Sequence, residues 1–357
     1  MAVISFKCPY CDGELIFDPA SGQYKCEYCL SKFTQEEVDK MNQTESVGTS
    51  ADTSKTSVEK EDKIQEQSGA VVYHCPSCGA EIVTDATTAA TFCYYCHNPV
   101  ILSGRLEGEY LPDKIIPFEI TKEQAVKAFL EYVGKKKFIP KAFFSKKQIE
   151  SITGVYFPYW NYNAEIENIL QGDGRMIRSW TAGDVRYTET KHYQVMRKGR
   201  VQLNHMSENA LQKANAELAK GVLPYHFEKM KDFNMGYLSG FMAEKRDIEK
   251  DGLKAQMKSL AQDYTNTLMR NTIDGYNAFT TDHSDIRFSK EEWQYCLLPV
   301  WTITYKGNDG KIYYYSMNGQ TGEVCGELPV DKKKLAIVSG SVSAVIAILG
   351  LLGGMLT

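Results

Sequence analysis

Eight cysteines near the N-terminus are the residues of this chain best suited to chemistry. They form four Cys-x-x-Cys pairs, and such a pair presents two sulfur atoms from one tight turn. The pairs are Cys8 with Cys11, Cys26 with Cys29, Cys75 with Cys78, and Cys93 with Cys96. Because Zn²⁺ favours four thiolates in a tetrahedron, the first two pairs predict one site and the last two a second. We expect two structural Zn²⁺ ions, each in a closed site that leaves no position for a substrate.

The two predicted sites belong to an internal duplication. Moving the first cysteine cluster along the chain by 67 residues superimposes it on the second without a gap, and Glu14 falls on Glu81. Two histidines, His74 and His97, lie beside ligands and could each replace a cysteine, although four cysteines already complete each site. A thioredoxin-like redox function would require a βαβ pattern around the cysteine pairs, and none is present in the sequence.

The chain divides into five predicted regions, which must position these sites. They are zinc ribbon 1 at residues 1–34, a flexible acidic linker at 35–70, zinc ribbon 2 at 71–104, an α+β core domain at 105–330, and a basic flank with a transmembrane helix at 331–357. The linker carries nine acids and four lysines. We expect it to be a tether because it has too few apolar residues to fold alone.

The core domain alternates between strand and helix patterns. Thr121 and Gln124 predict a capping box at the start of a helix. An antiparallel meander is predicted over 154–200, with breaks at 172–174 and 182–184. Helices are predicted at 207–220 and 243–271, the second with an apolar stripe of Leu253, Met257, Leu260, Tyr264 and Leu268. Strand patterns return after residue 286, so the fold class is predicted as α+β, with a mixed antiparallel sheet and helices.

The C-terminal region predicts a membrane anchor. Three lysines precede Leu335–Thr357, a stretch without charged side chains that is long enough to cross a ~30 Å hydrocarbon core as a helix. The positive-inside rule then places the bulk of the chain in the cytoplasm. We therefore expect a single-pass protein of the cell membrane, with the lipid bilayer as one partner. Small residues along this stretch also suggest a homo-oligomer.

Charge and motif searches limit the function. Ribbon 1 has a net charge of −1 and ribbon 2 of −2, so neither offers the clustered cations that bind phosphates, and protein partners are favoured over nucleic acid. No phosphate-binding loop, His-Glu-x-x-His or Gly-x-Ser-x-Gly motif is present. We therefore expect no enzyme activity.

The chain resembles bacterial TFIIB-type zinc-ribbon-containing membrane proteins. The resemblance is carried by the cysteine pairs and by the segments 87–93, 116–118, 154–160, 297–301 and 317–322. It implies a cytosol-facing membrane protein whose partners are flotillin-like (SPFH) or PspA-like proteins of envelope-stress modules. Only the eight cysteines carry over as functional positions. The expected function is a membrane-anchored adaptor that docks cytosolic proteins, and the alternative is a membrane-tethered nucleic-acid-binding protein.

Overall fold

The computed structural model describes residues 3–45, 70–93, 95–213, 221–307 and 310–354. They form two compact units. Unit 1 comprises Met1–Pro158, Leu211–Lys245 and Leu297–Thr357, and unit 2 comprises Tyr159–Ala210 and Arg246–Cys296. Most of the predicted flexible linker, residues 46–69, lies outside the described residues, as does 214–220 of a predicted helix.

Unit 1 contains the cysteine clusters and most of the sheet. Its elements before residue 159 are β1 (Leu15–Asp18), β2 (Gln23–Cys26), β3 (Lys32–Phe33), α1 (Gln35–Glu45), β4 (Ala70–His74), β5 (Glu81–Asp85), β6 (Thr88–Phe92), β7 (Pro99–Ile101), β8 (Lys114–Ile115), α2 (Lys122–Gly134) and α3 (Lys146–Glu150). Later elements are β11 (Lys231–Asp232), β12 (Met242–Glu244), β14 (Ile312–Asn318), β15 (Val324–Gly326) and α6 (Lys332–Gly354). Two long strands, β9 (Thr153–Ala182) and β13 (Ala278–Lys306), contribute to both units.

The main sheet joins ribbon 2 to the core. Its strands follow the order β11-β8-β13-β9-β12-β6-β7, with β14 and β15 continuing from β13. By contrast, β1, β2 and β3 form a separate sheet of ribbon 1. Removing ribbon 2 would therefore remove two strands of the main sheet, whereas ribbon 1 is a self-contained sheet.

Aromatic rings fill the core of unit 1. Phe118 stacks on Phe241 with ring centroids 4.2 Å apart, and Trp301 meets Phe118 edge-on at 5.1 Å. The predicted capping box of α2 is confirmed, because the Thr121 side chain accepts from the Gln124 N–H and the Gln124 side chain accepts in return. This helix starts next to the aromatic core, since Ile120 accepts a hydrogen bond from the Trp301 indole.

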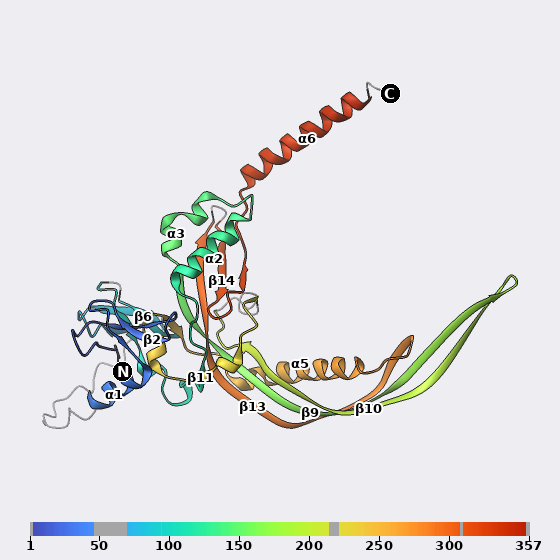
Figure 1. Cartoon of the computed structure of the whole chain (residues 1–357), viewed down its shortest axis with the longest axis horizontal. Coiled ribbons are helices and arrows are strands. Elements are labelled where there is room, and N and C mark those ends of the chain that lie inside the picture. The colour runs from blue at the N-terminus through green and yellow to red at the C-terminus, as the bar shows by residue number, and fades with distance from the viewer. Residues whose placement is uncertain (1–2, 46–69, 94, 214–220, 308–309, 355–357) are drawn as a thin grey trace. The chain divides into compact units, whose positions relative to one another are not determined.

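Unit 2 is built on long strands and one helix, α5 (Lys250–Arg270) (Figure 1). The strand β10 (Val185–Asn209) pairs antiparallel with β9 along nearly its whole length. The predicted break at 172–174 is wrong, because β9 continues through it. Its glycines instead permit close packing: a Cβ at Gly172 would lie 2.2 Å from the Thr280 carbonyl oxygen. The predicted turn at 182–184 is the hairpin turn.

The buried stripe of α5 differs from the prediction after its second residue. Leu253 and Met257 are buried as expected. The stripe then follows Ala261, Thr265 and Met269, while Tyr264 and Leu268 are about half exposed. The stripe keeps strict i, i+4 spacing, so small side chains let the helix lie close to β10. The preceding residues predicted to start this helix, 243–249, include β12 instead.

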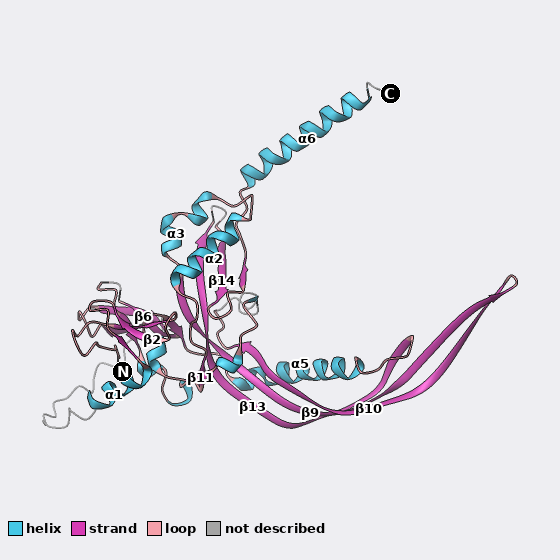
Figure 2. Cartoon of the chain, in the orientation of Figure 1, coloured by secondary structure: helices cyan, strands magenta, loops and turns pink. Residues whose placement is uncertain are grey.

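The predicted α+β class is wrong, because the protein is mostly β-sheet: 43% of it is strand and 25% helix (Figure 2). The physical reason is the length of β9, β10 and β13, which absorb segments expected to turn or to be helical. For example, Ser207–Asn209, predicted as the start of a helix, completes β10.

The predicted transmembrane helix is also wrong. Within the described residues, no helix has both the length and the apolar character required to cross a bilayer. The C-terminal helix α6 begins with three lysines, and serines at 339, 341 and 343 interrupt the apolar residues that follow. The predicted single-pass membrane location is therefore not supported.

Candidate metal centres

The four Cys-x-x-Cys pairs adopt one common turn. In each, the residue after the second cysteine donates its N–H to the carbonyl of the first cysteine at 2.9–3.0 Å. That residue has a positive φ in all four turns: Asp12, Leu30, Gly79 and His97. The left-handed conformation is needed to fold the chain back so that both sulfurs point the same way. Three of the four positions are not glycine, so the turn is held despite local backbone strain.

The turns bring each set of four sulfurs together. In both groups the Sγ atoms lie within 4.8 Å of one another. In the first group the Sγ atoms of Cys8 and Cys29 are 3.5 Å apart, as are those of Cys11 and Cys26. In the second the distances are 3.6 Å for Cys75 to Cys96 and 3.7 Å for Cys78 to Cys93. A tetrahedron with metal–sulfur bonds of ~2.3 Å has edges of about 3.75 Å, so both donor sets fit a tetrahedral ion.

The pKa values of the thiols are shifted in opposite directions at different cysteines. Hydrogen bonds with the side chain and backbone of Ser31 lower the pKa of Cys29 to about 6. Burial of Cys96, together with its hydrogen bonds to neighbouring cysteine sulfurs, raises its pKa to about 12. Four adjacent thiols oppose ionisation of one another because thiolates repel. A divalent cation would offset this repulsion, and it would release the protons on binding.

Neither histidine beside the cysteines belongs to a metal-binding group among the described residues. His74 Nε2 lies 3.8 Å from Glu81 Oε1, and both side chains are about 70% exposed. His97 occupies a positive-φ position in its turn, where its backbone rather than its ring serves the site. The two groups are therefore made of the eight predicted cysteines.

The two ribbons contact each other through a buried carboxylate, Glu14. Its Oε1 accepts from Lys7 Nζ at 2.5 Å, Ser77 Oγ at 2.9 Å and Asn98 Nδ2 at 3.2 Å. The Glu14 side chain is only 7% exposed. Because Ser77 and Asn98 lie in the cysteine turns of ribbon 2, Glu14 links one metal-binding group to the other.

A short backbone pairing strengthens this contact. Ile4 and Ile101 exchange two N–H to carbonyl hydrogen bonds, of 2.9 and 3.1 Å. Val3 packs against the apolar cluster of ribbon 2. This interface could not be predicted from the sequence, because Glu14 and Glu81 occupy equivalent positions and nothing local distinguishes them.

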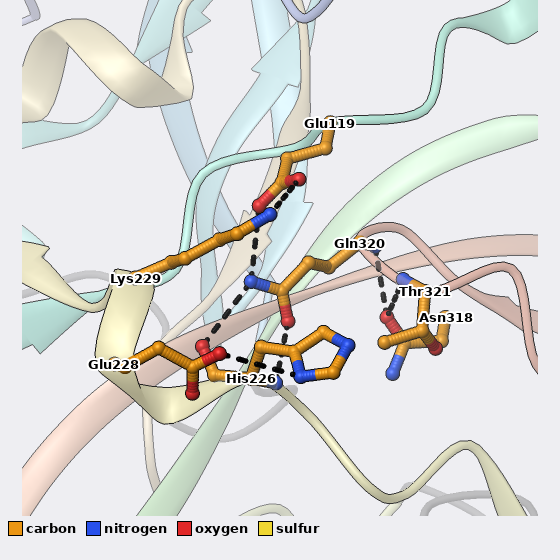
Figure 3. A network of polar contacts seen from close by, with 7 residues as sticks. All are labelled: Glu119, His226, Glu228, Lys229, Asn318, Gln320 and Thr321. Atoms are coloured by element: carbon orange, nitrogen blue, oxygen red, sulfur yellow. Dashed lines mark hydrogen bonds and ion pairs between the residues drawn. The ribbon is translucent and has the colours of Figure 1, made fainter.

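A second polar cluster lies in the core of unit 1 (Figure 3). The buried Gln320 accepts from the His226 N–H at 2.8 Å and donates to Glu119 at 3.1 Å. Asn318, also buried, accepts from the backbone N–H groups of Gln320 and Thr321. Its amide nitrogen donates to two carbonyls of the chain at 222–224.

The hydrogen bonds of this cluster indicate a structural role. Asn318 bonds to backbone groups, and Gln320 bonds to the backbone of His226 and to the Glu119 carboxylate, which fixes the turn after β14 against the segment before β11. The ionisable members at its edge, His226 and Lys229, are more than half exposed. The one sequence feature that could have revealed it is the pair of amide side chains separated by a single glycine.

The geometry therefore defines the class of protein: two four-cysteine metal-binding modules, one of them joined to a β-rich core. No family model matches the chain, and no solved structure matches it. A curated protein of Bacillus subtilis (strain 168), the uncharacterized protein YdjG, is 30% identical over 334 residues, which cover 94% of this chain and 92% of the relative. The chain belongs to the same family as that protein.

Proposed function

We propose that this protein is a zinc-ribbon adaptor, in which two structural Zn²⁺ ions shape a surface that docks other proteins. The observation that carries the proposal is the pair of tetrahedral four-cysteine groups held in contact by Glu14. Each Zn²⁺ would be held by four thiolates and would supply folding energy, on the order of 10 kcal/mol, rather than a reactive position. With no open ligand position, these centres support binding rather than catalysis.

Exposed aromatic side chains beside the metal centres favour a protein partner. Tyr10, Tyr28 and Tyr95 lie within the Cys-x-x-Cys turns, and each is at least 73% exposed. Tyrosine is enriched at protein interfaces because its ring buries apolar area and its hydroxyl keeps a hydrogen bond. The ribbons are weakly acidic, so binding of nucleic acid by the ribbons has less support.

The resemblance to TFIIB-type zinc-ribbon proteins supplies candidate partners. It supports SPFH-type and PspA-type proteins of an envelope-stress module as the first to be tested. In this proposal the ribbons recognise the partner, and the β-rich core carries the ribbons.

The proposal can be tested with the purified full chain and purified SPFH-type and PspA-type proteins. Zinc content is measured by mass spectrometry, and binding by biolayer interferometry. The variant Tyr10→Ala/Tyr28→Ala should keep two zinc ions yet bind its partner at least ~10-fold more weakly, because exposed aromatics dominate interfaces.

The matched control is Tyr264→Ala, which removes an exposed tyrosine from α5. It should bind as the wild type does. Partner binding that survives both the tyrosine changes and complete removal of zinc would rule out the adaptor role of the ribbons.

A further inference from the structure

The end of the β9–β10 hairpin carries a concentration of positive charge. Between Arg175 and Arg200 the chain has seven Arg and Lys residues and two acids, a net charge of +5 in a chain whose total is −4. We refer to residues 175–200 as the distal hairpin. It lies within unit 2 and continues past the end of α5 (Figure 1).

Several of these cations make no close ion pair among the described residues. Arg175 pairs with Asp173, Lys191 with Glu189, and Arg200 with Glu167. The remaining four make no ion pair with any residue that the structure describes: Arg178, Arg186, Arg197 and Lys198. A surface that keeps unpaired arginines exposed is suited to a polyanion.

Aromatic rings accompany the cations. Trp180 and Tyr187 are cross-strand partners, and their rings stack with centroids 5.7 Å apart and planes 14° apart. Both are about 45% exposed. The guanidinium of Arg178 lies 6.0 Å from the Trp180 ring centroid.

The face that bears these rings is uncovered. Residues on one face alternate along each strand, so Met176 and Tyr193 lie on the same face as Trp180 and Tyr187. Nearer the base of the hairpin this face is buried, with Leu170 and Val195 among its residues. Further out, both strands are exposed on both faces from Met176 to Gln194. A two-stranded hairpin is marginal by itself in water, and exposed aromatic patches mark interaction sites.

From these features we propose that the distal hairpin binds single-stranded nucleic acid. Proteins of this kind combine a cationic track for phosphates with aromatic side chains on which bases stack, and arginine adds cation–π attraction. Arg178 and Arg197 lie on the face of the Trp180–Tyr187 pair, and Arg186 and Lys198 lie on the opposite face. The nucleic-acid strand wraps around the hairpin, so that all four cations contact phosphates while a base stacks against the aromatic pair. An acidic protein would satisfy the cations but would leave this near-parallel aromatic pair unexplained. The site is separate from the ribbons.

The test uses the full chain and a fluorescein-labelled 16-nucleotide oligo(dT), with anisotropy measured from 50 to 200 mM salt. Four phosphate contacts predict a slope of log affinity against log salt near −2.8, which is a loss of about 50-fold across that range. The variant Arg178→Ala/Arg186→Ala should reduce the slope to about −1.4. Its control, Lys146→Ala/Lys147→Ala, removes the same charge from α3 and should leave the slope unchanged.

Stacking is tested separately. Trp180→Ala/Tyr187→Ala should weaken binding about 5- to 150-fold, the range for loss of one stacked base. Trp180→Phe/Tyr187→Phe keeps two rings and should retain most of the affinity, which separates loss of stacking from loss of hairpin structure. Circular dichroism and hydrogen exchange on each variant check that β9 and β10 remain paired.

Four results would overturn the proposal. The first is no binding at 50 mM salt. The second is binding that is lost on zinc removal but unchanged by the hairpin variants, which would assign it to the ribbons. The third is equal competition by poly-L-glutamate, which has no bases and would indicate an acidic protein partner. The fourth is preference for a duplex of the same length, which hides the base faces.

Discussion

The two ribbons have the same metal-binding geometry but different surroundings. Their cysteine turns share the same hydrogen bonds and the same left-handed residues. Yet Glu14 of ribbon 1 is buried against ribbon 2, whereas the equivalent Glu81 is about 70% exposed beside His74. The two copies therefore share their metal-binding groups but differ in the contacts that each makes.

Ribbon 1 has a buried tyrosine at a position where ribbon 2 has a threonine. Tyr24 is fully buried, and its hydroxyl donates to Gln35 at the start of α1. The equivalent position in ribbon 2 is Thr91 on β6. Ribbon 1 keeps a separate sheet and meets the core through ring packing of Phe17 on Tyr237, with centroids 5.1 Å apart, whereas ribbon 2 shares its strands with the main sheet.

Loss of one cysteine ligand should produce the largest difference in behaviour between the two ribbons. Cys26→Ser and Cys93→Ser should each reduce bound zinc from two ions to one per chain, with loss of folding energy on the order of 10 kcal/mol at the affected ribbon. Because β6 and β7 belong to the main sheet, the second change should expose amides into β12, and the first should affect mainly β1–β3. Zinc analysis and hydrogen exchange measure both. The control Cys325→Ser, at a cysteine outside both groups, should leave two zinc ions bound. If hydrogen exchange increased in the same strands in both ligand variants, the expected difference between the two ribbons would be contradicted.

Substitution of the two equivalent glutamates should give the next largest difference between the ribbons. Glu14→Ala should destabilise the contact between ribbons by about 1–3 kcal/mol, because it removes a buried acceptor from three donors. Glu81→Ala should change stability by less than ~0.5 kcal/mol, because its partner is exposed. Hydrogen exchange at Ile4 and Ile101 reports on this contact. If the two variants behaved alike, Glu14 would not link the ribbons.

Alkaline pH should affect ribbon 1 before ribbon 2. Burial, followed by the nearby Tyr237 and Tyr156, raises the pKa of Tyr24. A raised pKa in the fold means that stability is complete below the unfolded-state value of ~10 and is lost as pH rises above it, by roughly 1.4 kcal/mol at pH 11. Exchange in β1–β3 should therefore increase above pH 10 before that in β4 and β5. Tyr24→Phe should abolish this pH dependence, and a persistent dependence would assign it to other groups.

Exchanging the turn residues should have the smallest effect. Asp12 and Gly79 are equivalent, with φ of 60° and 74°. A Cβ at Gly79 would meet nothing within 4 Å, so Gly79→Asp should cost only the backbone strain, about 0.5–1 kcal/mol. Asp12→Gly should stabilise ribbon 1 by a similar amount. Thermal unfolding measures both, and a loss of zinc in either variant would show that these side chains do more than set the turn.

The metal-binding groups could be predicted from sequence because spacing alone determines them. A Cys-x-x-Cys turn is local, and the repeat of 67 residues indicates which pairs combine. The capping box of Thr121 and Gln124 is similarly local. What could not be predicted depends on distant residues. Glycines at 172 and 174 look like a turn, yet they serve close packing against a strand a hundred residues later.

The helix patterns failed for a related reason. Tyr264 and Leu268 continue an apolar spacing that Leu253 begins, but the buried side of α5 instead follows Ala261, Thr265 and Met269. The helix packs against β10, a strand that is distant in the sequence. The transmembrane helix was predicted from the apolar composition of the C-terminal stretch alone. The described part of α6 does not meet the requirement for a membrane span.

The bonds around Glu14 impose an order of events on a newly made chain. Asn98 follows Glu14 by 84 residues, which takes roughly 4–17 s to synthesise at 5–20 residues per second. During that delay all four cysteines of the first group are made, while their docking surface does not yet exist. The leading module can therefore bind its ion first, and docking onto the trailing module closes the assembly.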